Sequence, residues 1–140
     1  MVHFLHRKQA IHVAVLGTYA LLAVALTWPL ILHLGTHLPG SDTWAFDEYT
    51  FVWNTWWFRY SLLELGQDPL YTGHIFYPLG ISLALFTYNL FNTIVALPLA
   101  LLPLPAISNL TFLLTTVLTA YGAFLLVRHL VAGTAAGGKA

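Results

Sequence analysis

The sequence predicts an all-α membrane protein, with three transmembrane helices and an external loop that carries an interfacial amphipathic helix. Three observations support this fold class. Of the 140 residues, 59% are hydrophobic and only 7% are charged, whereas about a quarter of the residues in soluble domains carry charge. Residues 9–41 and 69–127 contain no charged side chain at all. All five acidic residues therefore fall in one region, between positions 42 and 68.

The same composition excludes several classes of protein. Soluble domains and disordered chains need a polar surface, and nucleic-acid binders need a basic patch. This chain has neither, and its formal net charge is zero. We therefore expect no nucleic acid among its partners. The chain also lacks cysteine, which excludes disulfides, thiolate metal sites and cysteine nucleophiles.

Three apolar segments, 11–34, 81–102 and 107–127, are long enough to cross a bilayer, because a core of about 30 Å requires about 20 helical residues. Between the last two, Pro103 and Pro105 predict a tight turn and hence an antiparallel hairpin. Residues 128–140 are expected to form a flexible tail, because most residues from 132 onward are small.

Three amides lie within this predicted hairpin, at Asn89, Asn92 and Asn109. Because amides are costly in hydrocarbon, we expect one flank of the hairpin to face other helices or a polar cavity.

Basic residues predict the orientation. Arg7 and Lys8 precede the first span, whereas the loop at 35–80 holds one Arg against five acids. The positive-inside rule then predicts a multi-pass protein of the cell membrane, with residues 1–10 cytoplasmic and the loop external. With three spans, Arg128 would lie on the external side of the membrane, which the positive-inside rule disfavours. Alternatively, residues 1–34 are a cleaved secretory signal, although the apolar run continues too far beyond Ala25 to be typical of one.

Residues 47–65 of the loop contain no Gly or Pro and predict a helix of about five turns. Four of the five tryptophans lie in or just before it. Because tryptophan favours the membrane–water boundary, we expect this helix to lie along the outer surface.

Asp42, Asp47 and Glu48 cluster at the start of this helix. Such carboxylates could bind a hard divalent cation or supply a general base. Equally, they could cap the helix and solvate the loop. Glu64 and Asp68 are interpreted as solvated charges. The seven histidines admit haem or pigment ligation, but their positions form no known ligand pattern.

Several short motifs in this order resemble integral-membrane glycosyltransferases of the GT-C fold class. The resemblance covers most of residues 20–130. The motifs are Thr27-Trp28-Pro29-Leu30, His37-Leu38-Pro39-Gly40, Asp47 seven residues before Asn54 in Trp53-Asn54-Thr55-Trp56-Trp57, Leu63-Glu64-Leu65-Gly66-Gln67-Asp68-Pro69-Leu70-Tyr71-Thr72 and Phe76-Tyr77-Pro78-Leu79-Gly80.

The resemblance implies transfer of a sugar from a polyprenyl-phosphate donor to an acceptor on the outer side of the membrane. In this class the first external loop holds an active-site acid, and many members bind a divalent cation, Mg²⁺ or Mn²⁺, nearby. The acid corresponds best to Asp47, with Asp42 as the second candidate. Asp47, Glu48 and Asp42 are the expected metal ligands. Asp47→Asn is then expected to abolish transfer and to leave membrane insertion intact.

Two functions follow from the sequence. The chain is expected to be the amino-terminal membrane part of such an enzyme, inactive in isolation, because members of the class continue through many more spans. The alternative is a small non-catalytic transmembrane subunit that stabilises a larger complex. The expected partners are the lipid bilayer, a polyprenyl-phosphate-linked sugar and further transmembrane helices or subunits.

Overall fold

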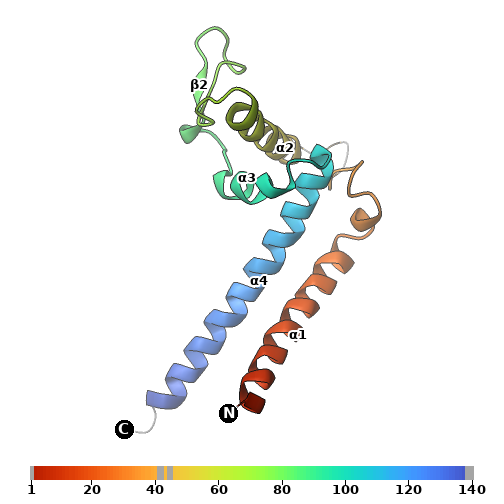
Figure 1. The fold of residues 1–140 in the computed structure, drawn as a ribbon, viewed down its shortest axis with the longest axis vertical. Helices are drawn as coiled ribbons and strands as arrows, with labels where there is room; N and C mark the ends of the chain where they lie inside the picture. Colours follow the sequence, from red (N-terminus) through yellow and green to blue (C-terminus); the bar gives the residue numbers. More distant parts are fainter. Residues whose placement is uncertain (1, 41–42, 44–45, 138–140) are drawn as a thin grey trace. The chain divides into compact units, whose positions relative to one another are not determined.

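The computed structural model describes residues 2–40, 43 and 46–137, and the side chains of these residues except 2–8, 46, 85 and 134–137. The chain is mostly helical, at 68%, and Figure 1 labels its α-helices and strand β2. It divides into two compact units, one formed by residues 1–28 and 113–140 and the other by residues 29–112. Asp42, one of the predicted site residues, lies outside the described residues.

The first unit contains helix α1 (Val2–Leu26) and most of helix α4 (Leu104–Gly137). Among the described residues these are the two helices long and apolar enough to cross a membrane, over Gln9–Leu26 and Leu104–Gly133. Only 6% of each span is buried inside the protein. Their apolar side chains therefore face outward, unlike those of a core helix in a soluble domain.

His12 joins these two helices within the first unit. Its Nε2 atom lies 2.8 Å from Nη1 of Arg128, and its Nδ1 atom lies 2.7 Å from Oη of Tyr121. Because a guanidinium can only donate, Nε2 accepts that bond, and the ring proton is then on Nδ1, which donates to Tyr121. The imidazole also meets Phe124 edge to face. This polar contact fixes the register of α1 against α4.

The second unit contains the remaining elements. Helix α2 (Phe46–Arg59) continues as the π-helix η2 (Tyr60–Glu64), which confirms the helix predicted at 47–65. Strands β1 (Tyr71–Thr72) and β2 (Ile81–Ser82) pair antiparallel, with Tyr71 opposite Ser82. The other elements are η1 (Leu30–Leu32), η3 (Leu83–Leu85), α3 (Leu90–Ala96) and η4 (Leu97–Leu99).

The core of this unit forms where α2 packs against α3 and where β1 packs against η3. Its buried apolar residues are Leu30, Trp57, Phe58, Leu83, Ala96, Ala106 and Ile107. Trp57 is only 2% exposed, and its indole N–H donates to the carbonyl of Pro69 at 3.1 Å. Its ring is therefore part of the protein core, not of a membrane-surface belt, because a protein acceptor satisfies the indole.

The predicted second span, 81–102, is not one continuous helix. It contains β2, η3, α3 and η4 in succession. The Asn89 side chain accepts a hydrogen bond from the backbone N–H of Asn92 and so caps α3 at its start. Pro98 lies at the start of η4. The apolar composition wrongly predicted one long helix here, because hydropathy does not detect residues that cap or end a helix.

The predicted ends of the other two spans also need correction. Helix α1 begins at Val2 and ends at Leu26, not at residue 34, because Pro29 cannot continue the helix. Helix α4 begins at Leu104 and includes Pro105, since proline is tolerated in a first helical turn. It continues to Gly137, so residues 128–137 are helical and not a flexible tail. A single glycine such as Gly133 costs only about 1 kcal/mol in a helix.

Gly80, next to β2, is a position that only glycine fits. Its φ is +67°, and an added Cβ would contact the phenol of Tyr71 and lie 2.7 Å from the carbonyl oxygen of Thr72. We expect Gly80→Ala to lower the free energy of unfolding by about 2 kcal/mol or more. Gly73→Ala is the matched control, because a Cβ there meets nothing within 4 Å. Denaturation followed by tryptophan fluorescence measures both variants; equal stabilities would contradict the prediction.

Candidate functional site

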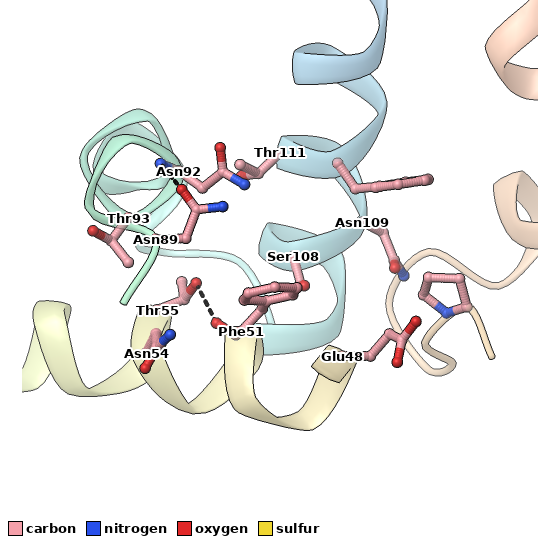
Figure 2. A pocket seen from close by; sticks show the side chains of 12 residues that line it. Glu48, Phe51, Asn54, Thr55, Asn89, Asn92, Thr93, Ser108, Asn109 and Thr111 are labelled. Atoms are coloured by element: carbon pink, nitrogen blue, oxygen red, sulfur yellow. Dashed lines mark hydrogen bonds between the residues drawn. The ribbon is translucent and has the colours of Figure 1, made fainter. Parts of the chain in front are cut away.

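A polar cavity of about 210 Å³ lies in the second unit. Residues of α2, α3 and α4 face it (Figure 2). They are Pro39, Glu48, Phe51, Asn54, Thr55, Asn89, Asn92, Thr93, Ser108, Asn109, Thr111 and Phe112. Asn89, Asn92 and Asn109 are all among them, so the three amides face a cavity within the protein, although residues 81–102 do not form one helix of the predicted hairpin.

Two of the amides in this cavity are completely buried and are held by backbone carbonyls. The Asn54 Nδ2 atom donates to the carbonyl of Thr87 at 2.8 Å. The Asn109 Nδ2 atom donates to the carbonyls of Leu34 and His37 at 2.8 and 2.7 Å. Because only the NH₂ group can donate to a carbonyl, these bonds fix the orientation of both amides. Their Oδ1 atoms are buried and have no hydrogen-bond partner among the described residues.

Glu48 supplies the carboxylate of the cavity. It lies with Asp47 in the first turn of α2, where the helix dipole stabilises negative charge. Its Oε2 atom is buried and lacks a hydrogen-bond partner in the described part of the chain. A buried oxygen without a partner is costly. Glu48 is thus poised to accept a hydrogen bond, a proton or a cation.

The structure separates the acids that cluster in the sequence. Asp47 precedes Glu48, yet its side chain is exposed and does not line the cavity. Glu64 and Asp68 are exposed, as expected for solvated charges. Within the described ranges, no three His, Asp or Glu side chains are grouped to hold a metal ion. The predicted metal set includes Asp42, outside those ranges, and it stays a prediction.

Arg59, the single cation of the predicted loop, does not line this cavity. Its Nη1 atom donates to the carbonyl of Ala100 at 2.7 Å and ties the end of α2 to the residue after η4. The residues that line the cavity include no Lys, Arg or His. Among the described residues that line the cavity, Glu48 is the one with a charged side chain.

Asn54 is a lining residue to which the sequence assigned no role in the site. It appeared as a motif position on the polar side of a tryptophan-rich helix. Its bond to Thr87 spans 33 residues, and no local pattern reveals such a partner. A polar amide among aromatic residues on a helix was the one available signal.

Tyr88, between η3 and α3, makes the free energy of unfolding depend on pH in the alkaline range. Burial, together with the negative charge of Asp68, raises the pKa of Tyr88 from 10.0 to about 12. The folded protein therefore holds this proton more tightly than the unfolded chain does. Its contribution to stability is complete below pH 10 and declines as the pH rises toward 12.

We expect Tyr88→Phe to remove this part of the alkaline decline in the free energy of unfolding. Tyr49→Phe, at an exposed position, is the control. Denaturation at several pH values measures the decline, and the ultraviolet absorbance of tyrosinate reports which phenol titrates late. The same alkaline decline in both variants would contradict the assignment.

The cavity can hold an uncharged, hydroxyl-bearing ligand. Its amides and carboxylate can hydrogen-bond hydroxyl groups, and Phe51 and Phe112 provide apolar surface. Comparison of the chain with known protein families, with curated proteins and with solved structures found no match.

Proposed function

We propose that this chain contributes the acid-bearing site of a membrane glycosyltransferase of the GT-C class, which transfers a sugar from a polyprenyl-phosphate donor to an acceptor. One observation carries the proposal: the half-buried Glu48, whose Oε2 atom is buried, lines a cavity with several amides in a chain with two helices of membrane-crossing length. The motif resemblance supports it independently. The proposal includes a cell-membrane location with a cytoplasmic amino terminus and an external site.

The chemistry requires a base near the acceptor hydroxyl. As the acceptor oxygen attacks the anomeric carbon, the bond from that carbon to the phosphate oxygen breaks. The hydroxyl proton passes to a carboxylate, and the phosphate leaves with the bonding electrons. Glu48 is the acid on this cavity, so we assign the proton to its carboxylate. Asp47, which the motifs favour, is the competing assignment.

A divalent cation is implied by the resemblance. The buried Oε2 of Glu48, without a partner among the described residues, fits the oxygen preference of Mg²⁺ or Mn²⁺. Asp47 is exposed and does not line the cavity, so among the described residues it does not share an ion with this oxygen, and Asp42 lies outside them.

Transfer from a defined donor tests the function. Because the chain is expected to be inactive in isolation, native membranes that contain it together with the rest of its enzyme are supplied with radiolabelled polyprenyl-phosphate-linked hexoses, one sugar at a time, and the label is followed into the acceptor fraction. We expect transfer above that of membranes without the chain. If none of the donors gives any excess, the proposed function is wrong.

A second function, a non-catalytic subunit that packs against other transmembrane helices, is favoured by exposed apolar side chains on and after α3. Phe91, Ile94 and Leu101 are 62%, 51% and 101% exposed. Such a surface favours contact with lipid or with another helix. Extraction in mild detergent should then recover the chain with fixed partners. A chain that purifies as a monomer and transfers sugar would contradict this alternative.

A further inference from the structure

Three oxygens of the cavity residues need hydrogen-bond donors. They are Oε2 of Glu48 and the Oδ1 atoms of Asn54 and Asn109, all buried and without a hydrogen-bond partner among the described residues. The NH₂ groups of both amides are already bonded to backbone carbonyls, so neither amide can turn to offer a donor instead. A ligand that satisfies these residues must supply donors.

The three oxygens come from separate positions. Glu48 and Asn54 are six residues apart on α2, which places them about 9 Å apart along the helix axis. In Figure 2, Glu48 projects from the start of α2, and Asn54 lies farther along the same helix. A single ion bound at about 2–2.6 Å from its ligands cannot contact both ends. The ligand must therefore carry several donors spread over its length.

The charge and size of the cavity further limit the class of ligand that it can bind. Among the described residues that line the cavity, Glu48 is the one acid and none is cationic, so this lining disfavours a phosphate. The volume of about 210 Å³ is below the roughly 300–1,000 Å³ of pockets for drug-sized ligands. Phe51 and Phe112 can cover an apolar ring face. One uncharged sugar ring fits all three conditions.

We propose that this cavity binds the hydroxyl groups of a single uncharged monosaccharide unit, with Glu48, Asn54 and Asn109 accepting its O–H donors, and that it excludes phosphate. The inference rests on the proposed function and adds which part of the substrate this cavity holds. The phosphate of the donor then lies outside it.

Saturation-transfer NMR on the full chain in detergent micelles tests this binding. The probes are the methyl glycosides of glucose, mannose and galactose, with glucose 6-phosphate, whose phosphate would have to enter the cavity with the ring, as the anionic comparator. We expect at least one methyl glycoside to bind, and the phosphate to bind at least about tenfold more weakly. Glu48→Gln replaces an acceptor oxygen by a donor and should weaken binding about tenfold.

Glu64→Gln is the matched control, since it removes the same charge from an exposed position outside the cavity, and it should bind as the wild type does. Asn54→Ala is the second variant, used if circular dichroism shows that Glu48→Gln is unfolded, and it should also weaken binding. The inference is overturned if no methyl glycoside binds, if the phosphate binds more tightly, or if the folded cavity variant binds as the wild type does. Sugar transfer without methyl glycoside binding overturns the inference alone, whereas methyl glycoside binding without any transfer overturns the proposed function alone.

Discussion

Glu48→Gln is expected to lower sugar transfer by about 10²–10⁴-fold, the usual contribution of a general base. Glutamine keeps the size of the side chain but cannot take the proton of the acceptor hydroxyl. The transfer rate from a polyprenyl-phosphate-linked hexose, measured in membranes with equal amounts of each variant, checks this. Glu64→Gln, at an exposed position, should retain the wild-type rate.

Substitution of the neighbouring acid, Asp47, tests whether Glu48 or Asp47 is the base. The motif resemblance assigns the catalytic acid to Asp47, whereas Glu48 is the acid that lines the cavity. Asp47→Asn and Glu48→Gln are therefore measured side by side. If Asp47→Asn abolishes transfer and Glu48→Gln does not, the base is Asp47 and the assignment to Glu48 is wrong.

Asn109→Ala is expected to lower the free energy of unfolding by about 2–4 kcal/mol. Asn109 is 0% exposed and donates to the carbonyls of Leu34 and His37. Removing the amide leaves both carbonyls without this donor, at a cost of about 1–3 kcal/mol for each buried group. Chemical denaturation in detergent micelles, followed by tryptophan fluorescence, measures the change.

Asn92→Ala is the control for this measurement. The Asn92 side chain also lines the cavity but is half-exposed, and its bond to Asn89 uses the backbone N–H, which alanine keeps. We expect a change below about 1 kcal/mol, as for most substitutions outside buried networks. Equal losses in the two variants would show that the Asn109 bonds do not hold this unit together.

Part of the fold was predictable because it depends on local composition. The long apolar runs around α1 and α4 and the Gly- and Pro-free stretch of α2 each predicted a helix, and the structure has them. The segment at 81–102, the predicted second span, was predicted from the same kind of evidence. That prediction was wrong because apolar composition alone cannot distinguish a long helix from short elements that end at capping residues and prolines.

The sequence by itself determined that the chain is apolar and mostly helical, that its acids are confined to one region, and that the amides at 89, 92 and 109 need polar surroundings. Only the tertiary structure decided which acid faces those amides. Asp47 and Glu48 are adjacent, yet consecutive helical residues point about 100° apart, so one is exposed and the other lines the cavity. The long-range bonds of Asn54 and Asn109 to distant carbonyls fix which of their atoms are left for a ligand, and no local pattern contains that information.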